Sequence, residues 1–136
     1  MRNRSTYLSV LISGILIFTS ICADDSMYKA GVASIDGWSA ASGRETELLS
    51  AQSLFVKAIK ANPKEPGPYV GLARVVEKLG YNVGLFGYST NFIVHADQFL
   101  EKALKLDPNF LDAHVRKAYF ALYSNDLVAA KKWMDS

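Results

Sequence analysis

Few residues in this chain have the type and spacing that chemistry at an active site requires. His95 lies two positions before Asp97, and Asp112 lies two positions before His114. Side chains two residues apart on a helix point away from each other, so neither pair predicts a metal site or an acid–base couple. Cys22 is the only cysteine, which excludes a disulfide within the chain.

Five common catalytic and cofactor motifs are also absent from the sequence. Gly80, Gly84 and Gly87 do not match a phosphate-binding loop or a dinucleotide fingerprint. There is no nucleophile elbow, no Cys-x-x-Cys pair and no haem attachment motif. We therefore expect a protein that is not an enzyme, with no catalytic residue, no cofactor and no bound metal.

Length and charge narrow the class of protein further. With 136 residues the chain is long enough for one ordinary domain. Arg2 and Arg4 are the charged residues of positions 1–23, so the remainder carries 13 basic and 13 acidic side chains and is formally neutral. A neutral domain has no general attraction to nucleic acid or to an anionic membrane surface. We expect no nucleic-acid partner.

The first 23 residues have the pattern of a secretory signal. Arg2 and Arg4 precede an uncharged run rich in Leu and Ile, from Tyr7 to Ala23, and Asp24 follows at once. A positive start, an apolar middle and small residues before a charged boundary are typical of a cleaved signal peptide. We expect residues 24–136 to be exported, and therefore periplasmic or secreted.

Two alternatives to cleavage remain open at this segment. Residues 7–23 have the minimum length of a membrane anchor, which would be the one contact with a membrane. Cys22 resembles the acylated cysteine of a lipoprotein, but the bulky Ile21 before it departs from that pattern. Because the arginines keep the N-terminus in the cytoplasm, the domain is exported under either alternative.

Residues 24–136 contain an internal repeat with an offset of 45 residues. Its first part is a small residue, a large apolar residue, a small residue and a proline, and its second part begins six residues after the proline. The first copy is Ala51, Phe55, Ala58, Pro63, then Tyr69, Leu72, Ala73, Val76; the second is Ala96, Leu100, Ala103, Pro108, then His114, Lys117, Ala118, Ala121.

This spacing predicts antiparallel helices. Small residues let neighbouring helices approach closely, and each proline ends a helix because the residue before it avoids the α conformation. No segment alternates like a strand. After a weak first helix near Ser26, the expected helices are Gly43–Ala61 with a Ser42 and Glu45 capping box, Pro66 or Pro68 to Leu79 with Gly80 ending it, Ser89, Thr90 or Asn91 to Leu106, Asn109–Tyr123 and Asp126–Asp135.

The repeated series resembles the tetratricopeptide repeat over Ser42 to Met134, and more loosely from Met27 onward. The resemblance implies an all-α fold of stacked antiparallel helical hairpins, a short solenoid of about three repeats with the last incomplete. The family's period is about 34 residues, so about 11 residues are inserted near residues 80–90. With Phe92, this loop's aromatic residues Tyr81, Phe86 and Tyr88 either contact a partner or pack over the second repeat.

In this family the ligand lies in the concave groove that the first helix of each repeat lines. Carried over by position, the resemblance implies a groove of Val70, Arg74, Glu77, Asp112, Val115, Arg116, Tyr119 and Leu122. Arg74, Arg116 and Tyr119 are the preferred contacts. The function expected from the resemblance is a non-catalytic protein–protein interaction module that binds a peptide or helix.

Two alternatives to groove binding are carried forward. Leu127, Trp133 and Met134 lie near the C-terminal end, where we expect no cap helix. The protein is therefore alternatively a structural subunit, or a truncated relative of a larger tetratricopeptide protein, that self-associates there. The remote alternative is an accessory domain of an enzyme.

Overall fold

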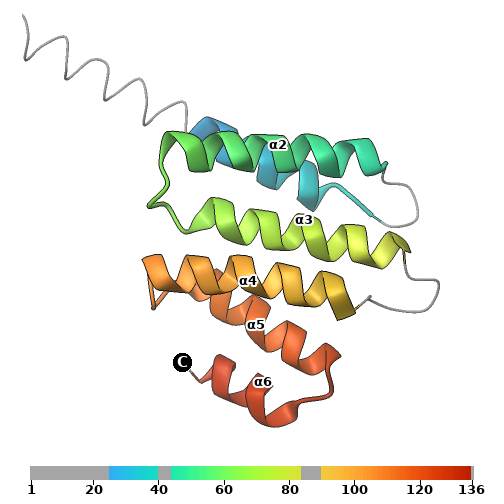
Figure 1. Ribbon diagram of the computed structural model, residues 1–136, viewed down its shortest axis with the longest axis vertical. Coiled ribbons are helices and arrows are strands. Elements are labelled where there is room, and N and C mark those ends of the chain that lie inside the picture. Colours follow the sequence, from blue (N-terminus) through green and yellow to red (C-terminus); the bar gives the residue numbers. More distant parts are fainter. Residues whose placement is uncertain (1–24, 40–43, 84–89, 136) are drawn as a thin grey trace, which may run out of the picture.

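The computed structural model describes residues 25–39, 44–83 and 90–135. In this part of the chain all regular elements are helices, so the expected all-α class is confirmed (Figure 1). A first helix over residues 25–36 precedes α2 (Glu45–Ala61), α3 (Gly67–Val83), α4 (Thr90–Leu106), α5 (Leu111–Tyr123) and α6 (Leu127–Met134). The signal segment 1–23 and most of the inserted loop lie outside the described residues.

The helices pack in the order in which they occur. Contacts join α2 to α3, α3 to α4, α4 to α5 and α5 to α6, and α3 also touches α5. In Figure 1 they follow one another along the long axis, with neighbours in sequence running in opposite directions. The architecture is thus a helical stack with a repeated unit. No helix in the described ranges is long and apolar enough to cross a membrane.

The two turns that contain the prolines have the same hydrogen bonds. The Asn62 side-chain oxygen accepts from the backbone N–H of Lys64 at 3.3 Å. In the second copy the Asp107 carboxylate accepts from the backbone N–H of Asn109 at 2.9 Å. These side chains form local turns in front of the next helix. The sequence repeat is therefore also a repeat in backbone structure.

In each turn, one further hydrogen bond connects the proline to the helix that follows. The Tyr69 hydroxyl donates to the Pro63 carbonyl at 3.1 Å. Forty-five residues later, the His114 ring Nε2 lies 2.7 Å from the Pro108 carbonyl. A carbonyl only accepts, so Nε2 carries the proton. His114 thus has the structural role that Tyr69 has, as its place in the repeat predicts.

The core consists of two clusters that share α3. The small residues of the repeat, Ala51, Ala58, Ala96 and Ala103, are fully buried, as are the large residues Phe55 and Leu100. The first cluster joins the first helix, α2 and α3 through Ile35, Trp38, Leu48, Ala51, Phe55, Leu72 and Val75. The second joins α3, α4 and α5 through Tyr69, Val70, Ala73, Ala96, Leu100, Ala103, Ala113 and Phe120.

Phe55 fills the first cluster because two glycines make room for its ring. A Cβ at Gly31 of the first helix would lie 2.7 Å from the ring, and a Cβ at Gly71 of α3 would lie 2.5 Å from it. Real Cβ atoms essentially never come so close. Gly31 costs the first helix some intrinsic stability, and the buried phenylalanine between three helices offsets that cost.

Two predicted helix boundaries are wrong. Gly80 does not end α3, which continues to Val83; a Cβ at Gly80 would lie 2.6 Å from the Cβ of Phe92, so this glycine allows α4 to approach. At the start of α2 the cap residue is Arg44, whose backbone N–H donates to the Glu47 carboxylate at 3.4 Å. The helix begins at Glu45, and Ser42, the other residue of the expected capping box, lies outside the described residues.

Candidate partner-binding surface

The eight residues predicted for a groove do not form one surface. Val70 is fully buried in the second core cluster, where it packs in a group with Leu100 and Phe120. Its assignment to a partner-binding groove is wrong, because no atom of its side chain reaches the surface. The equivalent Val115 on α5 is 54% exposed. The same position is therefore core in one repeat and surface in the next.

Arg74 and Glu77 of α3 make ion pairs between helices. The Arg74 guanidinium bonds to the Asp36 carboxylate at the end of the first helix. Glu77, which is buried, accepts from Arg116 of α5 at 3.4 Å. Burial raises the pKa of Glu77, and the charge of Arg116 acts in the opposite direction. The two pairs connect the first helix, α3 and α5.

Asp112 lies in the first turn of α5, half-buried and outside the pocket described next. A negative charge there is favourable because the helix N-terminus carries partial positive charge. Burial raises the pKa of the Tyr28 hydroxyl in the first helix, and the Asp112 carboxylate adds to that rise. The charge of Asp112 on α5 therefore affects the pKa of a side chain on the first helix.

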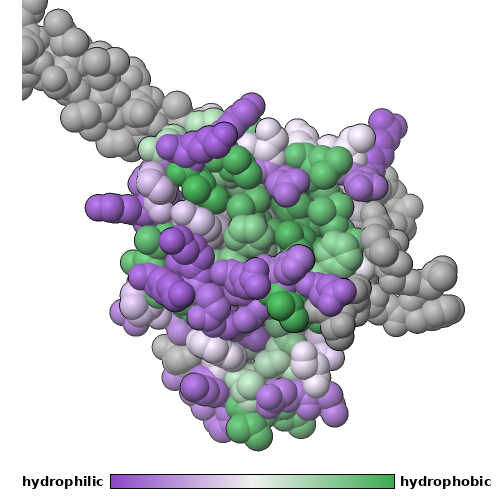
Figure 2. Space-filling view, in the orientation of Figure 1, coloured by the Kyte–Doolittle hydropathy of each residue, from purple (hydrophilic) through white to green (hydrophobic). Residues whose placement is uncertain are grey.

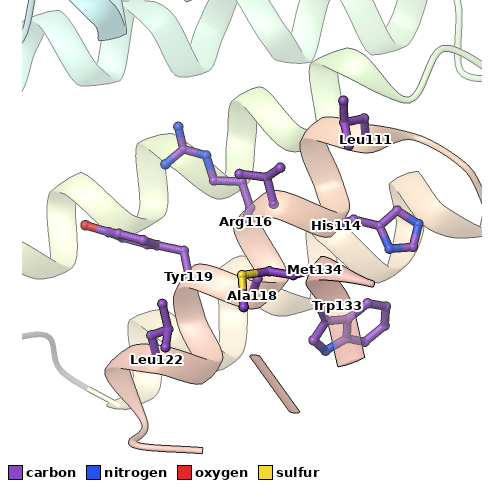
Figure 3. A pocket seen from close by; sticks show the side chains of 9 residues that line it. Leu111, His114, Arg116, Ala118, Tyr119, Leu122, Trp133 and Met134 are labelled. Carbon is purple, nitrogen blue, oxygen red and sulfur yellow. The ribbon is translucent and has the colours of Figure 1, made fainter. Parts of the chain in front are cut away.

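The other four predicted residues come together in a pocket of about 480 Å³ between α5 and α6 (Figure 3). Val115, Arg116, Tyr119 and Leu122 line it together with Leu111, His114 and Ala118 of α5 and Trp133 and Met134 of α6. Figure 3 shows Arg116 and Tyr119 pointing away from His114 and Trp133, so the two pairs form opposite sides of the pocket.

An exposed apolar stripe on α5 forms the floor of this pocket. Leu111, Val115, Tyr119 and Leu122 follow one another at spacings of 4, 4 and 3, which places them on one helix face. Their exposed fractions are 74%, 54%, 39% and 48%. An apolar surface of this extent, with charged residues at its rim, marks an interaction site or an aggregation hazard.

Helix α6 also has exposed apolar side chains, and one of them, Met134, lines the pocket. Leu127, Val128 and Met134 are 67%, 83% and 65% exposed. Figure 2 shows hydrophobic side chains at the α6 end of the molecule, below the hydrophilic band that crosses α4. The predicted groove on α5 and the predicted C-terminal contact on α6 are therefore neighbouring parts of one surface.

Tyr119 is positioned at the pocket by Tyr123. Their hydroxyl oxygens lie 2.8 Å apart, and their rings meet edge to face with centroids 4.7 Å apart. This hydrogen bond, with a smaller contribution from burial, raises the pKa of Tyr119 to about 12. The phenol stays protonated at physiological pH and keeps its ability to donate or accept a hydrogen bond.

Lys117 holds α6 against the rest of the pocket, a role that the sequence analysis missed. This buried lysine pairs with the Asp97 carboxylate at 3.0 Å and with Glu101, both on α4. Its Nζ lies 4.8 Å from the ring centroid of Trp133, close enough for a cation–π interaction. The signal in the sequence is a lysine at the repeat position where the first copy has Leu72.

The described residues offer no group of three or more His, Cys, Asp and Glu side chains able to hold a metal ion.

No protein-family model, no curated protein and no solved structure matches the chain. The geometry of the α5–α6 surface therefore carries the functional argument. The tetratricopeptide resemblance rests on the internal repeat.

Proposed function

We propose that this protein is an exported, non-catalytic interaction module of tetratricopeptide type, which binds a helix or peptide of another protein along α5. The observation that supports the proposal is the stripe of four exposed apolar residues that forms the floor of the pocket of about 480 Å³. Covering such a stripe removes apolar surface from water, which is favourable by roughly 25 cal/mol for each Å² buried. The scaffold is already folded, so binding does not have to order it.

The polar groups at the pocket suit a helix or extended peptide. Tyr119 is part of the apolar floor and Arg116 lies beside it, and arginine and tyrosine are among the residue types that most often dominate binding energy at protein interfaces. Amphipathic helices bind such grooves through apolar residues at helical spacing. Specificity would come from Arg116 and Tyr119, and affinity from the apolar floor.

Photo-crosslinking tests the proposal in the native host. A crosslinking residue at Tyr119 should capture one discrete protein, whereas one at Lys57, exposed on α2 away from the pocket, should not. Val115→Lys should abolish the capture from position 119. Val94→Lys on α4 is the matched control, because Val94 is 56% exposed and lies outside this pocket. Equal, diffuse labelling from both positions would refute a partner at α5.

A second candidate is a structural subunit that self-associates through α6. The exposure of Leu127, Val128 and Met134 on α6 favours it, and Met134 also lines the pocket. Sedimentation of the protein would then give a dimer that Leu127→Lys and Met134→Lys dissociate. A monomer at high micromolar concentration would exclude this candidate and leave the surface to another protein.

A further inference from the structure

The pocket face of α5 has a covered counterpart on α3. The offset of 45 residues matches Val115 with Val70, Ala118 with Ala73 and Leu122 with Glu77. The hydrogen bonds of Tyr69 and His114 to their prolines show that this correspondence holds in three dimensions. The two helices therefore present the same face to whatever follows them in the stack.

On α3 this face is buried by neighbouring helices. Val70 and Ala73 are fully buried and Glu77 is 6% exposed. The covering residues of α5 include Ala113 and Phe120, which share the core cluster with Val70 and Ala73. Between them, Arg116 reaches Glu77. The helix that covers α3 thus presents a small residue, a cation three positions later and an aromatic ring seven positions later.

On α5 the same face is only partly covered. Helix α6 has 8 residues where α4 has 17. Val115 and Leu122 consequently remain 54% and 48% exposed. The chemistry also differs at one position, because Leu122 stands where α3 has the carboxylate of Glu77. A helix stacked on α5 meets an apolar side chain where α5 meets an anion.

We propose that a helix of another protein docks on α5 in the manner in which α5 docks on α3, with an apolar residue at the position that corresponds to Arg116. This inference rests on the proposed function and specifies its partner. A guanidinium buried against Leu122 would lose its hydration without gaining a counter-ion, which is costly. An apolar side chain there extends the contact instead.

The α5 sequence itself provides the probe. Two fluorescein-labelled peptides of residues 109–124 are compared, one with the native sequence and one with Arg116→Leu, and their binding to the full chain is measured by fluorescence anisotropy. We expect the Arg116→Leu peptide to bind about ten- to a hundredfold more tightly. In the Leu122→Glu chain, whose α5 now matches α3, the preference should reverse toward the native peptide.

The reversal distinguishes a helix bound in the register proposed here from non-specific hydrophobic binding of the peptides. Leu122 is half exposed, so Leu122→Glu should keep its helicity, which circular dichroism checks. Equal binding of the two peptides, or a preference that Leu122→Glu does not reverse, would overturn this proposal. If Val115→Lys still abolished that equal binding, the proposed function would stand with a different partner helix.

Two further outcomes overturn the inference in other ways. If neither peptide binds and the chain sediments as a dimer that Leu122→Glu dissociates, a second copy covers α5. If neither peptide binds and the chain is a monomer, α5 does not take a helix in this register, and crosslinking at Tyr119 then decides separately whether another kind of partner does.

Discussion

Lys117 is the residue at which this chain departs most clearly from its own repeat. It lies where the first copy has Leu72, and both residues are buried. Burying an ammonium group is unfavourable unless the charge is paired. Asp97 and Glu101 supply that pairing, and the ring of Trp133 lies over the same ammonium group. One substitution in an apolar series thus becomes the junction of α4, α5 and α6.

Two substitutions at Lys117 distinguish packing from charge. Lys117→Ala should lower the free energy of unfolding by about 1–3 kcal/mol, because it removes the packed side chain and leaves Asp97 and Glu101 without their cation. Lys117→Leu, which copies position 72, should stay within about 1 kcal/mol of the wild type, since an apolar residue often replaces a buried ion pair without loss. Urea unfolding measures both. Equal losses would show that the charge itself is required.

The hydrogen bond between Tyr119 and Tyr123 gives a prediction about pH. The pKa of Tyr119 in the folded protein is about 12, against 10.0 for an ordinary tyrosine. The pair therefore stabilises the fold below pH 10, and this contribution is lost as the pH rises toward 12. Tyr123→Phe should lower the pKa of Tyr119 toward 10, as followed by NMR of the labelled phenol carbon. An unchanged pKa would assign the rise to burial.

At this scale the sequence predicted the buried residues of the repeat and only part of the exposed surface. Val115, Arg116, Tyr119 and Leu122 do line one pocket. Val70 is equivalent to Val115 by period and chemistry but lies in the core. Helical periodicity identifies a face of a helix, and only the length and position of the neighbouring helices decide whether that face is covered. The spacing of apolar residues along one helix does not predict the length and position of its neighbours.

Among the helices, the strongest predictions were those that rested on proline and small residues. The ends of α2 and α4 lie where Pro63 and Pro108 predicted them. Gly80 was misread, because a glycine that ends a helix and one that admits a neighbouring side chain look alike in sequence. In the structure it lies within α3, against Phe92. The role of Gly80 is thus determined by the contact between α3 and α4.

Packing of the first helix, α2 and α3 around Phe55 predicts a difference between two glycines. Gly71→Ala should lower the free energy of unfolding by about 1–3 kcal/mol, because the new Cβ would lie 2.5 Å from the Phe55 ring. Gly37→Ala is the control, since its Cβ would meet the Ala33 carbonyl oxygen at 3.6 Å, an ordinary contact. Thermal unfolding measures both. If Gly71→Ala and Gly37→Ala changed the free energy of unfolding equally, the Phe55 ring would not be tightly packed against Gly71.

Over the whole molecule, stability is distributed along the stack. The two core clusters are connected by Ile59 and Phe99, which pack against both. Helix α4 packs more extensively on α3 than on α5, whereas α5 and α6 pack closely on each other. Within α6 only Ala130 is buried. We therefore expect the stack, whose contacts are mainly between neighbours, to open locally rather than as one unit.

This distribution predicts the order of amide hydrogen exchange. Amides of α6 and α5 should exchange first and those of α3 and α4 last, because the α5–α6 hairpin can separate at its less extensive contact with α4. Trp133→Ala should accelerate exchange in α6 and α5 alone, since Trp133 packs on Lys117 and His114 of α5.

Trp38→Ala is the matched control at the other end of the stack. Trp38 belongs to the first core cluster and donates its indole N–H to the Arg44 carbonyl at 3.2 Å. Its removal should accelerate exchange in the first helix and α2 and leave α6 unchanged. If either variant accelerated exchange uniformly from residue 25 to residue 135, the protein would open as a single cooperative unit. A partner helix that binds the native state would then slow exchange throughout the described residues, and not first in α5 and α6.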